Sequence, residues 1–381
     1  MILRQLRLKG FRAHEHTQLS LGAGINVITG PNGAGKTNLL EAIHYLCLSK
    51  SFLTATDRYA VRKSADFFDI EASFEPSDGE EGATEGTTVR LVCVPSEGKK
   101  LFINGAPLER ISDIVGRYPI VIHSPEDYVL SSGGPDERRK FLNNVLSQAR
   151  PLYLADLMKY RRTLRQRNAL LARRSNLATL DSWTEELVTT GARVIDARRR
   201  FVSAFSVFLR NAYSQIAEVA EEPTIEYRSV DKEDPGESVD AIAAFMRSRL
   251  ERSRQIEIER GRTLVGPHHD ELTFRLDGLE VRRFGSQGQH RTFVMALKIG
   301  QYFYLQDRLD MLPIMLLDDA FAHLDDRRTT AFLDLLASDR VGQSIITAAS
   351  DHYFEGRVKS EDVENRSFKV EKGVVSDVAI A

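Results

Sequence analysis

The order of apolar and polar residues divides the chain into a strand-rich beginning, a helical middle and a strand-rich end. The N-terminal "MILRQLRLKGF" alternates apolar and basic residues, which predicts a strand. "GINVIT" predicts a buried strand, and "TTVRLVCV" with "KKLFINGAPL" predicts a hairpin. The acidic stretch at 75–86 is almost free of apolar residues and predicts an exposed loop.

Helical spacing begins around Pro135. Two runs of apolar residues seven apart predict two long antiparallel helices joined by a short turn: Leu157, Leu164 and Leu171, then Leu187, Val194, Phe201 and Phe208. Ser182 and Glu185 fit a capping box at the start of the second helix. Arg161 and Asn168 interrupt the first apolar seam, which favours a compact helical subdomain over a long coiled coil.

Strand patterns return after residue 260, following a further helix expected from Val239 to about Arg260. "ELTFRLDG", "PIMLLDD" and "QSIITAA" predict strands, and an amphipathic helix from Gln289 to about Leu309 lies between the first two. Together these segments indicate an α/β fold.

Composition narrows the class of protein. The 381 residues are 42% hydrophobic and 28% charged, as in ordinary soluble globular proteins, with no apolar run long enough to cross a membrane. Cys47 and Cys93 are too few for a disulfide framework, so we expect a reducing, cytoplasmic location. The net charge of -2 means that any DNA binding has to come from local basic patches.

"GPNGAGKT" matches the full phosphate-loop pattern, between a predicted strand and the predicted helix "NLLEAIHYLCL". Glycines let backbone N–H groups surround phosphates, and the helix N-terminus adds a positive dipole. Lys36 would reach the β/γ-phosphates and the Thr37 hydroxyl would bind Mg²⁺; the alternative is a chance glycine-rich turn. The predicted ATP-binding residues are Gly30, Pro31, Asn32, Gly33, Ala34, Gly35, Lys36, Thr37 and Asn38.

"PIMLLDDAFAHLDDRR" places two carboxylates at the end of an apolar strand. Beside a phosphate loop, Asp318 would hold the Mg²⁺ shell with Thr37, and Asp319 would be the candidate base for the attacking water. The predicted catalytic residues are therefore Lys36, Asp318 and Asp319. The alternative is a strand that ends in a solvated acidic turn.

"FGSQGQHRT" is a second glycine-and-amide loop that precedes a long helix, an arrangement that suits phosphate. Taken locally, Ser286 is equally well explained as the N-cap of that helix.

A different cluster, at 268–271, combines two histidines with two acids, but adjacent ligands rarely point at one metal ion.

"KYRRTLRQRNALLARR" contains seven basic residues and no acid, whereas a solvated helix face usually interleaves acids. A smaller cluster lies at 198–200. Arginines suit phosphate backbones, and without a base-reading motif we expect structure-selective binding. The alternative is that these arginines pair with acids elsewhere in the fold. The DNA-binding candidates are Arg161, Arg162, Arg165, Arg167, Arg173 and Arg174.

Several stretches taken together resemble the RecF family of SMC-like ABC ATPases. They are "GFRAHEHTQLSLGAGINVITGPNGAGKTNLLEAI", "LSKSF", "SPEDYVLSSGGPDERRKFLN", "ERGRTLVGPHHDEL", "GSQGQHRT" and "LLDDAFAHLDD", and they cover nearly the whole chain in order. The resemblance implies a P-loop ABC/SMC-like ATPase head made from both chain ends, 1–125 and 261–381, with a helical insertion domain at 126–260.

The resemblance also implies how two chains work together. Two heads would dimerise with ATP and Mg²⁺ between them, so that the signature loop of one chain faces the nucleotide of the other: Ser286, Gln287, Gly288 and Gln289. Asp325 would be the D-loop aspartate and Thr347 the switch candidate. The implied partners are double-stranded, gapped and single-strand/double-strand junction DNA, with RecR and the RecO pathway. The implied activity is a weak, DNA-stimulated ATPase in repair of DNA damage, the SOS response and replication restart.

Some positions depart from the family pattern. Asp319 stands where most ABC ATPases have Glu, and His323 stands where Glu is usual in the family. The region that corresponds to the Q-loop, "PIVIHSPEDY", contains no glutamine. Gln287 stands where a glycine is usual. Three other functions remain open: a transporter motor subunit, an SMC-like nuclease, and a nucleotide-regulated scaffold that scarcely hydrolyses ATP.

Overall fold

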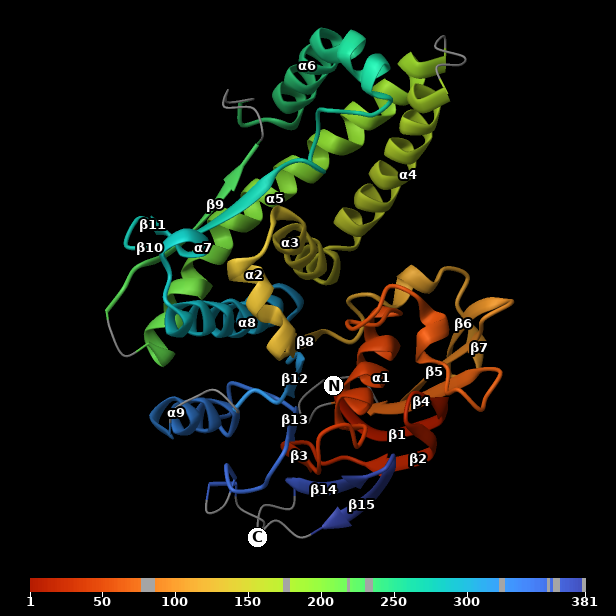
Figure 1. Cartoon of the computed structure of the whole chain (residues 1–381), viewed down its shortest axis with the longest axis vertical. Coiled ribbons are helices and arrows are strands. Elements are labelled where there is room, and N and C mark those ends of the chain that lie inside the picture. The colour runs from red at the N-terminus through yellow and green to blue at the C-terminus, as the bar shows by residue number, and fades with distance from the viewer. Residues whose placement is uncertain are drawn as a thin grey trace. The chain divides into compact units, whose positions relative to one another are not determined.

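The computed structural model describes residues 1–76, 86–173, 179–217, 220–229, 236–321, 326–354, 357–358 and 364–378. The chain forms two compact units, shown together in Figure 1. Unit 1 comprises Met1–Asp127, Gln215–Glu218 and Gln301–Ala381, and unit 2 comprises Tyr128–Ser214 and Val219–Gly300. Both ends of the chain therefore belong to one unit.

The first sheet of unit 1 is antiparallel and has the strand order β2-β1-β4-β5-β6-β7. Side chains along β1 and β4 alternate between buried and more exposed positions, which is why the sequence alternates apolar and polar residues there. The strands are β1 (Ile2–Phe11), β2 (His14–Ser20), β4 (Phe68–Glu75), β5 (Thr87–Val94), β6 (Gly98–Ile103) and β7 (Ala106–Pro107).

The second sheet of unit 1 has the order β15-β14-β3-β13-β12-β8, and its neighbours from β14 to β8 are parallel. The strands are β3 (Ile25–Thr29), β8 (Ile120–His123), β12 (Ile314–Asp318), β13 (Ser344–Ala348), β14 (Arg366–Glu371) and β15 (Val374–Val378). Every residue of β3, β12 and β13 is buried, as the continuous apolar runs predict.

Helix α1 (Lys36–Leu48) joins the two sheets of unit 1 into one core. Eleven of its thirteen residues are buried, and its apolar side chains share a cluster with residues from both sheets. Helix α9 (Asp326–Leu336) also belongs to this unit. Unit 1 also contains the 3-10 helices η1 (Asp57–Ala60) and η2 (Ile111–Ile114), and η3 (Pro125–Tyr128) ends one residue into unit 2. Burial of α1 between the two sheets explains why most of its residues are apolar.

Unit 2 is built around two long helices, α4 (Pro151–Arg173) and α5 (Leu180–Ile216), preceded by α2 (Val129–Ser132) and α3 (Pro135–Ala149). Ion pairs join Asp156 to Arg193 and Lys159 to Glu186, so sequence numbers rise along one helix as they fall along the other. The predicted antiparallel pair is therefore confirmed. The predicted capping box is wrong, because α5 already begins at Leu180 and Ser182 lies inside its first turn.

The remaining elements of unit 2 follow α5 in the sequence. Helix α6 (Val239–Arg260) has the bounds that the sequence predicts, with the Ser238 side chain accepting a hydrogen bond from the Ala241 N–H. The other elements are β9 (Pro223–Arg228), β10 (Glu271–Leu276), β11 (Leu279–Glu280), α7 (Val281–Phe284) and the start of α8 (Gln287–Leu309). Residues 261–300, expected in the head, lie instead with the helical unit, because β10 pairs with β9.

A buried arginine on α4 connects this helix to α6 by an ion pair and to α5 by a hydrogen bond. Arg167 on α4 is 1% exposed, and its Nη2 donates to Glu257 on α6 at 2.7 Å, where Glu257 is 0% exposed. The same guanidinium donates to Thr184 on α5 and to Thr263. Arg167 is therefore enclosed by protein, and it cannot act as one of the expected DNA contacts.

We expect Arg167→Met or Glu257→Leu alone to lower the free energy of unfolding by about 3–5 kcal/mol, because each leaves a buried charge unpaired. The double variant should lose much less than the sum, since both charges are then gone. Urea unfolding followed by helical ellipticity measures this. Arg200→Met removes an exposed arginine paired with Asp196 and should cost less than about 1 kcal/mol. Equal losses of unfolding free energy for Arg167→Met and Arg200→Met would contradict a buried ion pair between Arg167 and Glu257.

Candidate nucleotide site and second phosphate loop

The loop from Gly30 to Gly35 connects the end of β3 to the start of α1, whose first two residues are Lys36 and Thr37, as the motif requires. Pro31, Asn32 and Gly33 are exposed, whereas Ala34, Gly35 and Lys36 are buried. At Gly30 the backbone has φ 145°, and an added Cβ would lie 2.2 Å from the Val370 carbonyl oxygen. Gly30 is thus required by both conformation and the close approach of β14.

Two residues far apart in sequence, His14 and Gly373, form hydrogen bonds with the backbone of this loop. The His14 Nε2 lies 3.0 Å from the Gly35 carbonyl oxygen, and its Nδ1 lies 2.9 Å from the Thr17 hydroxyl. The Gly373 N–H donates to the Ala34 carbonyl at 2.9 Å. Burial lowers the pKa of His14. Sequence reasoning missed His14 and Gly373, because a contact between residues so distant in the chain leaves no local pattern.

Lys36 folds back over the loop that precedes it. Its Nζ donates to the Gly30 carbonyl at 2.7 Å and to the Pro31 carbonyl at 3.1 Å. Burial lowers the pKa of Lys36, and the nearby carboxylates of Asp319 and Asp318 oppose that shift. The ammonium group is therefore held at the mouth of the loop, beside two carboxylates.

Asp318 ends β12 and is the centre of a hydrogen-bond cluster. The Thr37 hydroxyl donates to its two carboxylate oxygens at 2.9 and 3.0 Å, and the Thr347 hydroxyl donates at 2.7 Å. Burial raises the pKa of Asp318, and the hydrogen bonds from Thr347 and Thr37 oppose that rise. The parallel pairing of β12 with β13 places Asp318 opposite Thr347, so the sheet itself builds this cluster.

The spacing of Thr37 and Asp318 suits one metal ion. Neighbouring ligands of an octahedral Mg²⁺, each about 2.1 Å from the ion, lie about 3 Å apart. The Thr37 hydroxyl and the Asp318 carboxylate have this separation. Both are oxygen donors, which Mg²⁺ prefers, so the residues present fit the ion.

Asp319 follows directly in a left-handed backbone conformation, with φ 49°. Its N–H donates to both oxygens of Thr347, at 3.0 Å to the hydroxyl and 3.1 Å to the carbonyl. Strained conformations of this kind are common at functional sites. Thr347 therefore fixes both aspartates, and the switch candidate belongs structurally to the same cluster.

The second loop, Ser286–Gln289, lies in unit 2 at the start of α8. The Ser286 hydroxyl accepts from the Gln289 N–H at 3.2 Å, and the Gln289 side-chain oxygen accepts from the Ser286 N–H at 2.8 Å. This reciprocal pair is a capping box, so the local N-cap interpretation of Ser286 is confirmed. Ser286, Gln287 and Gly288 are exposed and remain accessible to a ligand or a second chain.

The predicted DNA-binding arginines divide into three groups. Arg161, Arg162, Arg165 and Arg173 on α4 are exposed and form no ion pair within the described part of the chain. Arg167 is buried, and Arg174 lies outside the described residues, as does the D-loop candidate Asp325. In the smaller cluster, Arg198 is buried and its Nη1 donates to the Pro267 carbonyl at 2.6 Å.

The residues at 268–271 do not converge on one point. His268 contacts the Tyr160 hydroxyl, the Tyr227 hydroxyl donates to Asp270, and Arg138 pairs with Glu271. Burial lowers the pKa of His268 to about 3. Within the described ranges, no group of three or more His, Cys, Asp or Glu side chains is arranged to hold a metal ion.

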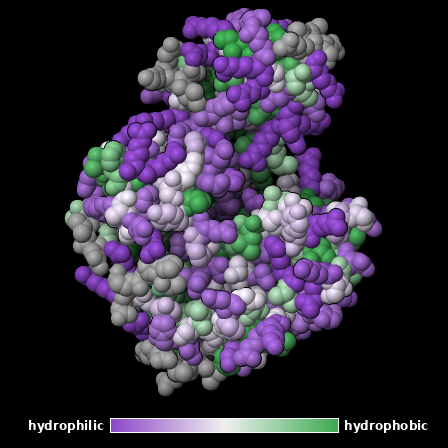
Figure 2. Space-filling model, viewed as in Figure 1, coloured by the Kyte–Doolittle hydropathy of each residue, from purple (hydrophilic) through white to green (hydrophobic). Residues whose placement is uncertain are grey.

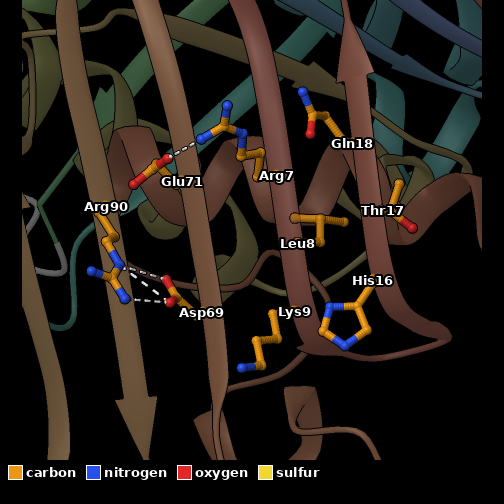
Figure 3. Close-up of a pocket in the computed structure, with 9 residues that line it drawn as sticks. All are labelled: Arg7, Leu8, Lys9, His16, Thr17, Gln18, Asp69, Glu71 and Arg90. Atoms are coloured by element: carbon orange, nitrogen blue, oxygen red, sulfur yellow. Dashed lines mark hydrogen bonds and ion pairs between the residues drawn. The ribbon is translucent and has the colours of Figure 1, made fainter.

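A separate groove of about 420 Å³ lies on the outer face of the antiparallel sheet (Figure 3). Two ion pairs cross it, Arg7 with Glu71 at 3.1 Å and Arg90 with Asp69 at 2.6 Å, so much of its charge is neutralised. Its lining residues are Arg7, Leu8, Lys9, His16, Thr17, Gln18, Asp69, Glu71 and Arg90. The predicted phosphate-binding residues are not among them.

The fold and the cluster around Asp318 define the class of protein, an ATPase head of the SMC-like type. The family model described as RecF/RecN/SMC N terminal domain matches residues 2–374. A Salinibacter ruber protein named DNA replication and repair protein RecF is 52% identical over 379 residues, covering 98% of this chain and 91% of the relative. The protein of that name from Chloroherpeton thalassium is 44% identical, covering 91% and 94%.

Solved structures give the same result. The recombination mediator protein RecF-ATP in the RecFOR pathway is similar with a TM-score of 0.86 at 29% identity, covering 99% of this chain and 98% of that one. The SmcHead bound to the C-winged helix domain of ScpA has a TM-score of 0.57 at 16% identity, covering 100% and 98%, which shows likeness of fold alone. The chain belongs to the RecF family. In the described part of the chain, no helix is both long enough and apolar enough to span a membrane.

We expect Gly30→Ala to lower the free energy of unfolding by about 3 kcal/mol or more, because backbone strain of about 1–3 kcal/mol adds to a collision with β14. Gly33→Ala is the matched control. Gly33 also has a positive φ, 78°, but a Cβ there would meet nothing within 4 Å, so about 1–2 kcal/mol is expected. Thermal and urea unfolding measure both. Similar losses would show that close packing against Val370 does not constrain the loop.

Proposed function

We propose that the chain binds ATP with Mg²⁺ at Gly30–Asn38, dimerises on doing so, and holds DNA during recombinational repair and replication restart. The observation that carries this proposal is the cluster in which Thr37 and Thr347 donate to Asp318 beside the phosphate loop. Membership of the RecF family supports it, as does the likeness to RecF-ATP in the RecFOR pathway.

Each residue of the cluster has a distinct chemical role in this proposal. Lys36 exchanges its loop carbonyls for the β/γ-phosphates, and Thr37 and Asp318 hold Mg²⁺. The ion would favour the ionised form of Asp318, which burial otherwise disfavours. Asp319 orients and activates the attacking water. Asp is shorter than the Glu of most ABC ATPases, which favours slow hydrolysis; hydrolysis then releases the dimer from DNA.

Dimerisation follows from the second loop. Ser286, Gln287 and Gly288 are exposed at a helix N-terminus, where N–H groups and the helix dipole favour an anion. In the proposed dimer this loop faces the γ-phosphate held by the other chain. Asp325 would cross the same interface. An ATP molecule between two heads thus makes the oligomeric state depend on the nucleotide.

DNA contacts are assigned to the exposed face of α4. Figure 2 shows that the coloured surface around α4 and α6 is mostly hydrophilic on the side in view. The exposed arginines Arg161, Arg162, Arg165 and Arg173 attract phosphates without reading bases, which suits gapped duplexes and single-strand/double-strand junctions. The RecFOR relatives support RecR and the RecO pathway as partners in helping to load the recombinase.

A scaffold that scarcely hydrolyses ATP is the second candidate, and Asp319 in place of Glu favours it. Both candidates bind ATP and dimerise. Steady-state phosphate release with and without gapped DNA separates them. An ATPase gives turnover that DNA increases, and a scaffold gives none above the Lys36→Met background.

Ser286→Arg should leave ATP binding intact and abolish the ATP-dependent dimer, because the bulky cation fills the space for the partner's phosphate. Light scattering with ATP and Mg²⁺ measures the dimer, and fluorescence titration with an ATP analogue measures binding. Ser286→Thr keeps the hydroxyl and the N-cap and should dimerise normally. Lys36→Met should lose both binding and dimer. An unchanged dimer fraction in Ser286→Arg would overturn the signature assignment.

The triple variant Arg161→Ala, Arg162→Ala and Arg165→Ala should bind gapped duplex DNA more weakly with ATP present. The slope of log affinity against log salt should fall by about one for each phosphate that an arginine no longer neutralises. Fluorescence anisotropy over a range of salt concentrations measures this. The control is Arg247→Ala with Arg254→Ala, which removes partly exposed arginines that already pair with Glu185 and Asp181. If the control weakens binding equally, α4 is not the DNA-binding face.

A further inference from the structure

The side chain of Gln289 is shared between two neighbours. Its oxygen accepts from the Ser286 N–H at 2.8 Å, which closes the capping box of α8. Its amide nitrogen donates to a carboxylate oxygen of Glu221 at 2.6 Å. Both ends of the carboxamide are thus occupied, and its orientation is fixed, because a flipped amide would place oxygen against oxygen at Glu221.

Glu221 is itself held in place from the interior of unit 2. The Tyr213 hydroxyl, from the last turn of α5, donates to its other carboxylate oxygen. The Tyr213 ring is buried and packs edge-on against Phe293 of α8, with ring centroids 6.3 Å apart, and Phe293 packs against Phe274 of β10. A chain of hydrogen bonds therefore runs from the exposed loop to an aromatic core: Ser286, Gln289, Glu221, Tyr213.

The backbone beside Glu221 is anchored as well. The Glu222 N–H donates to the Asp277 carboxylate at 2.9 Å, and the Asp277 N–H donates back to the Glu222 carbonyl at 3.1 Å. Asp277 belongs to the turn between β10 and β11. The carboxylate of Glu221 thus projects from a fixed piece of backbone, which makes it a firm acceptor for Gln289.

We infer that Glu221 is a positioning residue of the Ser286–Gln289 loop, holding it in the conformation in which a second copy of this chain presents ATP to it. This inference rests on the proposed function. The Ser286 hydroxyl accepts from the Gln289 N–H, so its own proton is left to donate to a phosphate oxygen. Glu221 acts through Gln289, because fixing that carboxamide fixes the Ser286 N–H and the first turn of α8. The loop can then bind the ATP of the second copy without the entropy cost of ordering its side chains on association.

The experiment uses the full chain with Glu221→Ala, Glu221→Gln and the neighbouring control Glu222→Ala. Within the described residues, the Glu222 side chain makes no hydrogen bond or ion pair. Light scattering against protein concentration, with ATP and Mg²⁺, gives the dimer affinity. We expect Glu221→Ala to weaken it by roughly tenfold or more, because a charge-assisted hydrogen bond is removed from both copies. Glu222→Ala should match the unmodified chain, and ATP affinity of the dilute monomer should be unchanged in all three.

Glu221→Gln separates positioning from general destabilisation. Its carboxamide oxygen can still accept from Gln289, so the dimer affinity should return to within about threefold of the unmodified chain. Equal weakening by Glu221→Gln and Glu221→Ala would overturn the inference. So would an unaltered dimer in Glu221→Ala, provided that Ser286→Arg abolishes it; in that case the proposed function stands and the positioning role does not.

Amide hydrogen exchange gives a readout that does not depend on dimerisation. In the nucleotide-free chain, Glu221→Ala should speed exchange at the Ser286 amide by roughly tenfold, since the Gln289 oxygen no longer stays on it. Glu221→Gln should keep the original rate. Unchanged exchange in Glu221→Ala would overturn the positioning role even if Ser286→Arg shows that the proposed function itself is wrong.

Discussion

The site depends on the hydrogen bonds that Asp318 accepts at the end of a buried strand. A carboxylate taken out of water is costly, and burial raises the pKa of Asp318 accordingly. Thr37 and Thr347 offset that cost with hydroxyl donors from α1 and β13. For these donors to meet, β3, β12 and β13 must be adjacent, parallel and aligned at the same edge, and they are. Because β3 comes from the N-terminal part of the chain and β12 and β13 come from the C-terminal part, this alignment requires both ends of the chain to share one unit.

The Gly30–Gly35 loop and the Ser286–Gln289 loop are stabilised by different means. The first is shaped by glycines and supported from behind by His14 and by the β14–β15 turn at Gly373. The second is a helix start whose exposed face is fixed by side chains, through Gln289 and Glu221. A loop that surrounds a nucleotide within one chain needs a rigid backbone. A loop that in our proposal meets the nucleotide of another chain needs its side chains already oriented, because association otherwise has to order them.

In unit 2, one arginine of α4 is buried in an ion pair and others are exposed at the surface. The arginines of α4 look alike in sequence, yet Arg167 is enclosed with Glu257 while Arg161, Arg162 and Arg165 face solvent. The helical period decides this, since residue 167 lies on the face that Leu157, Leu164 and Leu171 also occupy. The seven-residue apolar pattern already contained that information. It was obscured because an arginine is ordinarily counted as exposed.

The sequence by itself determined whatever is local. The phosphate loop, the buried strand that ends in Asp318, the antiparallel helix pair and the bounds of α6 each follow from short patterns of glycine, apolar period or capping residue. Tertiary structure decided what needs a distant partner. It placed the start of α5 ahead of the predicted capping box, put 261–300 with the helical unit through the pairing of β9 with β10, and brought His14 to Gly35 and Glu221 to Gln289. Local patterns record the conformation of a segment, whereas hydrogen bonds between distant segments depend on how those segments pack, and packing is a property of the whole chain.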